Sequence, residues 1–166
     1  MNKPSFESPA FDKARLIANL GLWGFGLAKV PMITYVGPKI CRIDDDVLEM
    51  QIKHRWRNNN HLKSLYFGAF AVGADVAGGF LAYWIARKLG IKITLAFASF
   101  DAEFKRRAHG HTIFRCEEGA LIRQMILQSR ERGERVTREL NIQAWTEEEP
   151  APVAVFKLGL SLKAID

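Results

Sequence analysis

Cysteine is scarce in this chain of 166 residues, where Cys41 and Cys116 are the only two. Two cysteines so far apart cannot form the disulfide framework of a small secreted domain or a zinc knuckle. The sequence also has no internal repeat and no low-complexity tract. Residues 1–9 are polar and lack the basic-then-apolar pattern of a signal peptide. We therefore expect a loose tail there and a cytoplasmic protein with reduced thiols.

Charge of one sign is in modest excess. The chain has 24 Lys and Arg against 18 Asp and Glu, a net charge of +6, and the cations are scattered. Such an excess favours an anionic ligand or a membrane surface, but it does not indicate nucleic-acid binding. With 48% hydrophobic residues, the composition excludes a disordered chain, and the length fits one domain.

One long apolar run stands out, because residues 65–86 contain a single charge, Asp75. The run is long enough to cross a bilayer, which takes about 20 apolar residues. However, a carboxylate at the centre of a spanning helix costs roughly 2.5–3.5 kcal/mol on insertion scales, and Asp75 lies near the midpoint. We therefore expect a buried helix and no membrane span. Asp75 then lies in a water-poor setting, which is typical of a functional carboxylate.

The remaining patterns predict an α+β fold. Ser64 is expected to cap the long helix and Gly90 to end it. Apolar residues recur at helical spacing over residues 11–28 and 121–126, which predicts two further helices. Apolar and polar residues alternate within 39–56, which predicts a strand pair that turns at residues 44–46 and continues to Trp56. The same alternation predicts strands at 91–107, 111–116, 136–144 and 156–162. Strands joined by short turns favour an antiparallel sheet packed against one helix.

A family resemblance lies around the start of the long helix. Residues 60–69, with Asp75 fifteen residues after Asn60, resemble the start of the central helix in hotdog-fold acyl-CoA thioesterases of the phenylacetate-pathway type. Residues 100–110 are similar to that family's next strand and turn, and the whole chain looks closest to a subgroup of uncharacterised thioesterase-like proteins. The resemblance implies a hotdog fold, with a curved antiparallel sheet wrapped around the long central helix. It also implies a tail and helix at residues 1–30 and one hotdog domain at 31–166.

The resemblance further implies catalytic roles for four residues. Asp75 would be the general base, or less favourably a nucleophile, and Asn60 would orient the water or the carbonyl. The backbone N–H groups of Phe67 and Gly68 would bind the oxyanion at the helix N-terminus. Tyr66 and Phe67 stand where the family has His and Gly. A purely structural role for Asp75, and a turn-forming role for Asn60, remain open alternatives.

The expected substrate is an acyl-CoA ester, and no cofactor is expected, because CoA enters only as part of the substrate. Lys105, Arg106 and Arg107 are candidates for binding its phosphates, although a solvated strand end would look the same. In the resembled family the site is shared across a dimer interface, so we expect a homodimer or a dimer of dimers.

Two alternative functions remain open. The first is a protein that binds acyl chains or lipids without catalysis. The second is a hydroxyacyl-thioester dehydratase or hydratase that uses His61, fourteen residues before Asp75, as a substrate-binding or catalytic group. His109 and His111 lack a third ligand nearby, so no metal site is expected.

Overall fold

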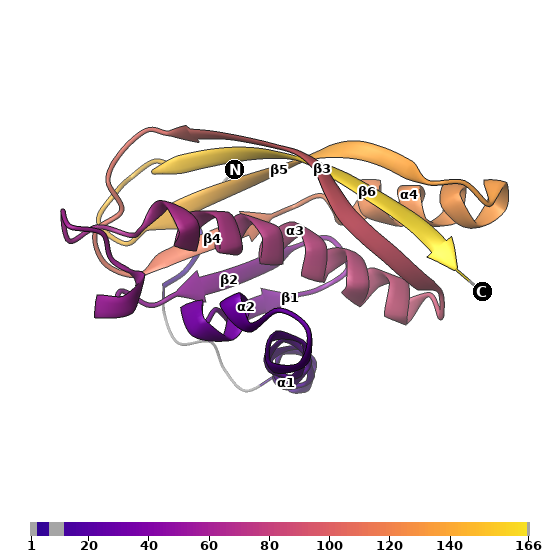
Figure 1. Ribbon diagram of the computed structural model, residues 1–166, viewed down its shortest axis with the longest axis horizontal. Helices are drawn as coiled ribbons and strands as arrows, with labels where there is room; N and C mark the ends of the chain where they lie inside the picture. The colour runs from indigo at the N-terminus through magenta and orange to yellow at the C-terminus, as the bar shows by residue number, and fades with distance from the viewer. Residues whose placement is uncertain (1–2, 7–11, 166) are drawn as a thin grey trace.

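The computed structural model describes residues 3–6 and 12–165 and is an α+β structure (Figure 1). A six-stranded antiparallel sheet has the strand order β1-β2-β4-β5-β6-β3 and curves around the long helix α3. The elements are α1 (Lys13–Ala28), α2 (Pro31–Val36), β1 (Lys39–Ile43), β2 (Leu48–Ile52), the 3₁₀ turn η1 (Trp56–Asn58), α3 (Phe67–Lys88), β3 (Lys92–Phe104), β4 (Thr112–Cys116), α4 (Gly119–Arg132), β5 (Val136–Thr146) and β6 (Ala154–Ile165). The predicted sheet around one central helix is confirmed.

The apolar run forms α3, the central helix. By length and composition it is the one helix within residues 3–6 and 12–165 that could cross a membrane, yet 67% of its most apolar stretch is buried against the sheet. Gly73 lets the helix backbone approach the sheet closely, because a Cβ at this position would lie 2.4 Å from the Phe114 ring. Gly90 follows the helix with a φ of 68° and starts the turn into β3, as expected.

Two local expectations are wrong. The strand that was expected to continue to Trp56 ends at Ile52, and Trp56 lies in η1 with 88% of its surface exposed. The alternation of His54 and Trp56 with polar residues therefore does not reflect a sheet. Ser64 does not cap α3, which begins three residues later with Tyr66 at the N-cap position and no side-chain cap. The Ser64 hydroxyl donates instead to the Asn60 side-chain oxygen (3.2 Å).

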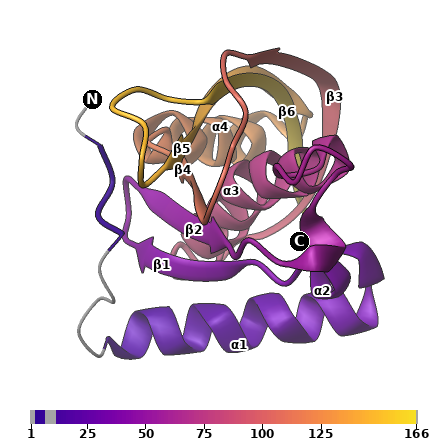
Figure 2. The same ribbon diagram turned by 90° about the vertical axis from the view of Figure 1, so that its left-hand side faces the viewer.

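Helix α1 packs beside the edge of the sheet (Figure 2). Asn19 of α1 bonds to Ile40 of β1 through both groups of its amide, accepting from the Ile40 N–H and donating to the Ile40 carbonyl, each at 2.9 Å. The side chain thus satisfies backbone groups that an edge strand leaves unpaired.

The predicted division of the chain at residue 30 stays a prediction. Much of the expected tail lies outside the described residues, but Pro4 is buried and the Lys3 ammonium donates to the Glu147 carbonyl (2.5 Å).

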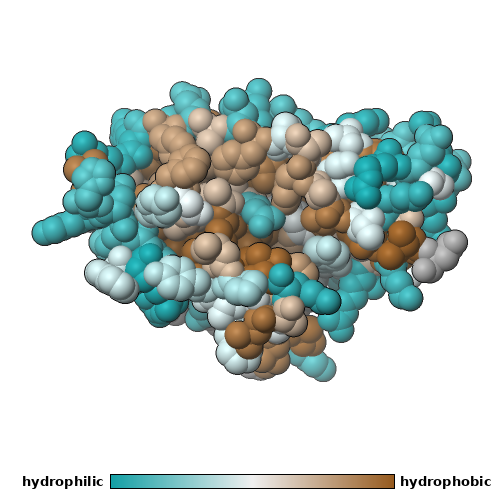
Figure 3. All heavy atoms as spheres, viewed as in Figure 1, coloured by the Kyte–Doolittle hydropathy of each residue, from teal (hydrophilic) through white to brown (hydrophobic). Residues whose placement is uncertain are grey.

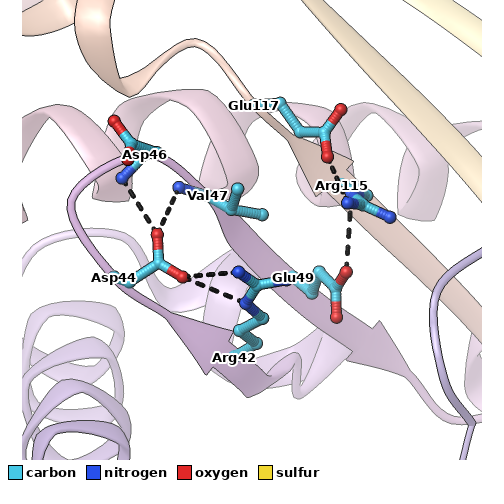
Figure 4. A network of polar contacts seen from close by, with 7 residues as sticks. All are labelled: Arg42, Asp44, Asp46, Val47, Glu49, Arg115 and Glu117. Atoms are coloured by element: carbon cyan, nitrogen blue, oxygen red, sulfur yellow. Dashed lines mark hydrogen bonds and ion pairs between the residues drawn. The ribbon is translucent and has the colours of Figure 1, made fainter. Parts of the chain in front are cut away.

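Two groups of polar contacts lie near one another, one within the β1–β2 turn and one between β2 and β4 (Figure 4). Asp44 pairs with Arg42 at 2.8 Å and accepts backbone N–H groups of the turn. Arg115 of β4 lies between Glu117 and Glu49, with 3.4 Å between its Nε and a Glu49 carboxylate oxygen. Only 8% of the Glu49 side chain is exposed. Burial raises the pKa of Glu49, and the Arg115 charge opposes this shift.

Candidate active site

The N-terminus of α3 presents unused hydrogen-bond donors. Phe67 and Gly68 are its first two residues, and within the described part of the chain their backbone N–H groups have no acceptor. The next two N–H groups bond back to the Tyr66 carbonyl, at 2.9 and 3.1 Å. Free N–H groups at the positive end of a helix dipole are suited to an oxyanion. Gly68 accommodates the Tyr66 ring, because a Cβ there would lie 2.7 Å from a Tyr66 ring carbon.

Asn60 organises the loop before this helix. Its side-chain oxygen accepts from the N–H groups of Leu62 (2.9 Å) and Ser64 (3.2 Å) and from the Ser64 hydroxyl. Its backbone N–H donates to the Ser64 carbonyl at 2.9 Å, which closes the turn. The Asn60 oxygen therefore has a structural task, and the amide nitrogen is the group that remains for a ligand.

Four of the predicted residues surround one hollow of about 200 Å³. Asn60 and Phe67 line it from the helix side, and Arg106 and Arg107 line it from the segment after β3. The ring of Phe67 leans toward the end of β3, with its centroid 5.8 Å from that of Phe104. The hollow therefore combines an apolar floor, two cations and the N-terminus of a helix.

Of the predicted binding residues, Arg106 and Arg107 line the hollow, whereas Lys105 and His61 do not. Arg106 forms an ion pair with Glu149, and the Lys105 ammonium is 3.6 Å from a Glu103 carboxylate oxygen. Arg107 is exposed, so its guanidinium is accessible to an anion from solvent. His61 is exposed in the loop and does not line the hollow. An anionic ligand at Arg106 would compete with the Glu149 carboxylate.

Asp75 lies in a second, more apolar cavity of about 240 Å³. Burial raises the pKa of its carboxyl group above the usual value of 3.8, and among the described residues neither a cation nor a hydrogen bond opposes that shift. The pKa of Tyr83, two turns further along α3, is also raised, first by burial and then by the Asp75 charge. The cavity is closed by apolar side chains of four elements: Leu22 and Phe25 of α1, Val30 and Ile33 at α2, Val76 and Phe80 of α3, and Leu95 and Phe97 of β3.

The two centres are separated along one helix. Asp75 follows Phe67 by eight residues, which corresponds to ~12 Å along an α-helix. A carboxylate at that distance cannot activate a water for a carbonyl held at the helix N-terminus of the same chain, where reacting atoms must approach to about 3 Å. One protomer therefore provides both halves of the predicted chemistry but does not bring them together.

Sequence reasoning did not identify the cover of the Asp75 cavity. Leu22 and Phe25 come from α1, at least fifty residues earlier in the chain, and no local pattern links them to Asp75. Tyr83 was accessible to prediction, because residues eight apart lie on the same face of a helix, two turns from one another. Cys41 and Cys116 are both reduced, and burial raises the pKa of the Cys116 thiol to about 12, which makes it an inert core residue.

Comparison with known proteins assigns the family. The model described as "Domain of unknown function (DUF4442)" matches residues 23–149, most of the chain. The chain belongs to the DUF4442 family. The matched region begins inside α1 and runs through α3 to the turn after β5, so it includes Asp75 and the start of α3. A search of curated proteins found no match to the chain.

Solved structures of the same fold are numerous. A Chlorobaculum tepidum protein of unknown function has a TM-score of 0.77 at 16% identity, covering 90% of this chain and 96% of its own. A Shewanella oneidensis protein described as a candidate thioesterase has a TM-score of 0.74 at 12% identity, covering 93% and 100%. A Haemophilus influenzae thioesterase has a TM-score of 0.64 at 16% identity, covering 95% and 94%. These likenesses confirm the predicted hotdog fold for this DUF4442 chain.

Proposed function

We propose that this protein hydrolyses acyl-CoA thioesters at a site built from two copies of the chain. The observation that carries the proposal is Asp75, a carboxylate of the central helix whose pKa is raised by burial in an apolar cavity. The structural neighbours named as thioesterases give this proposal its reaction class. The free N–H groups of Phe67 and Gly68 supply the second requirement, donors for an oxyanion.

A homodimer would bring the two centres together. Strand β3 is thirteen residues long and lies at the edge of the sheet, where one row of its backbone groups is unpaired. Phe100 and Phe104 are both more than 40% exposed there. Long, apolar edge strands pair readily with another chain. Antiparallel pairing of β3 with its copy would continue the sheet and turn the α3 N-terminus of one protomer toward Asp75 of the other.

The chemistry at such a site is simple. The Asp75 carboxylate takes a proton from a water, whose oxygen attacks the thioester carbonyl carbon. The N–H groups of Phe67 and Gly68 stabilise the negative charge that develops on the carbonyl oxygen. The C–S bond then breaks, and the departing CoA sulfur receives the proton from Asp75. The raised pKa makes Asp75 a stronger base than an exposed aspartate.

The proposed substrate would occupy both the hollow and the cavity. The Asp75 cavity would receive the acyl group, because all other side chains that line it are apolar or aromatic apart from the Tyr83 hydroxyl. Arg106 and Arg107 would bind phosphates of the CoA moiety, once Glu149 releases Arg106. CoA would take part only as a portion of the substrate, and the reaction as written needs no cofactor.

Hydrolysis of a panel of acyl-CoA esters, followed by detection of the free thiol, tests the function. We expect turnover for at least one ester and a loss of about 100-fold or more in Asp75→Asn, because a general base contributes roughly 10²–10⁴-fold. Glu131→Gln is the matched control, since Glu131 is an exposed carboxylate on α4, away from both centres. Full activity in Asp75→Asn would refute the mechanism. Tight binding of an acyl-CoA by the wild-type protein without turnover of any ester would instead favour a non-catalytic acyl binder.

A further inference from the structure

Helix α1 is apolar on both sides. Ala18, Leu22 and Gly26 are buried against the body of the protein. The opposite side exposes the outer stripe, which we define as Leu16, Leu20, Trp23 and Leu27, spaced at steps of four, three and four. Trp23 and Leu20 are 63% and 62% exposed. A helix that is apolar all round requires a second apolar environment, so the outer stripe needs a partner.

The outer stripe borders a groove and belongs to a larger apolar surface. A groove of about 480 Å³ runs along it between Leu16, Leu20 and Trp23 on one side and Ile33 and Pro38 on the other. Figure 3 shows brown, apolar side chains where α1 lies, at the bottom of the view. α2 follows directly and exposes Met32 and Tyr35 as well.

Positive charge predominates over negative charge around this surface. Residues 13–43 contain five Lys and Arg and no Asp or Glu. Lys13, Lys29 and Lys39 are exposed, and Lys39 lines the groove. Asp12 is the one carboxylate among the described residues that line the groove, and its oxygen accepts the Ala14 N–H (2.9 Å) and so caps the helix. An apolar stripe with a cationic rim is the chemistry that fits an anionic lipid surface.

The aromatic residues also suit a membrane–water interface. Trp23 and Tyr35 each have an apolar ring and one polar group, and such residues are enriched at the level of lipid head groups. The Arg57 guanidinium lies over the Tyr35 ring, 5.7 Å from its centroid, which adds a cation beside this ring.

We infer that the outer stripe of α1 docks this protein on an anionic lipid surface, with Trp23 and Leu20 inserted among the head groups and Lys13, Lys29 and Lys39 facing lipid phosphates. A second copy of the chain is the less suitable occupant. In a two-fold contact each patch meets itself, so these three lysines would face the same cations of the partner. The docking would place the protein at the surface without inserting the buried helix α3.

Vesicle co-sedimentation tests this inference on the full chain. One set of vesicles mixes phosphatidylglycerol into phosphatidylcholine, and the other contains phosphatidylcholine alone. We expect binding to the anionic vesicles that weakens as salt is raised, because salt screens the lysine charges. Trp23→Ser should weaken binding about tenfold or more, as expected for a large apolar side chain. Each reversal among Lys13→Glu, Lys29→Glu and Lys39→Glu should weaken it at least about fivefold.

Leu127→Ser is the matched control, because Leu127 is 48% exposed on α4 and lies outside the outer stripe. This variant should bind like the wild type. Unfolding curves of all variants check that the fold is intact. In addition, the fluorescence of the wild type should shift to the blue on anionic vesicles, whereas that of Trp23→Phe, which keeps three other tryptophans, should not.

Three results would overturn the inference. The first is equal binding to the neutral and anionic vesicles, and the second is unchanged binding by Trp23→Ser. The third is absence of binding together with an oligomer that Trp23→Ser dissociates, which would assign the outer stripe to a second copy of the chain. None of these outcomes depends on thioesterase activity.

Discussion

Replacing Gly73 with alanine tests how α3 fits against the sheet. The added Cβ would lie 2.4 Å from Cζ of Phe114 and 2.5 Å from Cε1 and Cε2. Carbon atoms in contact normally lie about 3.5–4.0 Å apart, so the overlap exceeds about 1 Å. The Phe114 ring cannot move away easily, because it is fully buried and packed against the rings of Phe70 and Phe156.

Two opposing effects determine how much Gly73→Ala changes the free energy of unfolding. Alanine favours a helix over glycine by about 1 kcal/mol. Overpacking a well-filled core costs roughly 1–3 kcal/mol, and the rigid ring at Phe114 favours the upper half of that range. We therefore expect Gly73→Ala to lower the free energy of unfolding by about 1–2 kcal/mol, which lowers Tm by roughly 2–8 °C for a chain of this length.

Urea unfolding at fixed protein concentration measures this change, with Gly24→Ala as the matched control. A Cβ at Gly24 of α1 has no atom within 4 Å, so that variant should gain stability of up to about 1 kcal/mol. The double variant Gly73→Ala with Phe114→Leu should be less destabilised than the sum of the two single variants, because the ring that is overlapped has been removed. Equal gains in stability for Gly73→Ala and Gly24→Ala would refute the close approach of α3.

Three further predictions concern polar contacts. Arg115→Met should lower the free energy of unfolding by about 3 kcal/mol in urea titrations, because it leaves Glu49 buried beside Glu117 without its cation. Asn19→Ala should cost about 1–3 kcal/mol in the same assay by leaving the Ile40 backbone groups unpaired. Asp75→Asn should raise stability at neutral pH by on the order of 1 kcal/mol. The folded-state pKa of Asp75 is raised, so wild-type stability should fall as the pH rises above about 3.8, and the two proteins should converge at lower pH.

Much of the fold could be predicted because its elements have strong periodicity. The run around Asp75 was too apolar for any exposed helix, and its central carboxylate favoured a buried helix over a membrane span. The long strands β3, β5 and β6 alternate apolar and polar residues over many positions. The end of β2 could not be predicted, since the alternation continues past Ile52 although the chain leaves the sheet there for the turn η1.

The candidate site was predictable only where it is local in sequence. Asn60, Phe67 and Gly68 are close along the chain, and the structure places Asn60 and Phe67 around one hollow and Phe67 and Gly68 in the first turn of α3. The cover of Asp75 by Phe25 depends on how α1 packs against α3 and β3, which no local pattern encodes. The prediction that Ser64 caps α3 was wrong, because its hydroxyl bonds to Asn60 within the loop, and such local hydrogen bonds compete with capping.

The pairing of Asp75 with the α3 N-terminus of a second protomer can be tested by mixing two inactive variants. Asp75→Asn removes the base, and Phe67→Pro removes one N–H of the oxyanion site. Phe67→Pro should keep the helix, because proline suits the first position of a helix and the extended backbone of Tyr66 (ψ 143°) suits a following proline. Phe67→Ala, which keeps the N–H, controls for loss of the phenyl ring. Each homodimer of Asp75→Asn or Phe67→Pro should be about 100-fold less active than the wild type.

The decisive measurement is the acyl-CoA hydrolysis rate of the heterodimer that contains one Asp75→Asn and one Phe67→Pro protomer, isolated through two different affinity tags. A site shared between protomers leaves one of the two sites intact, so the heterodimer should regain about half of the wild-type rate. A heterodimer as inactive as the two parent homodimers would contradict the shared site.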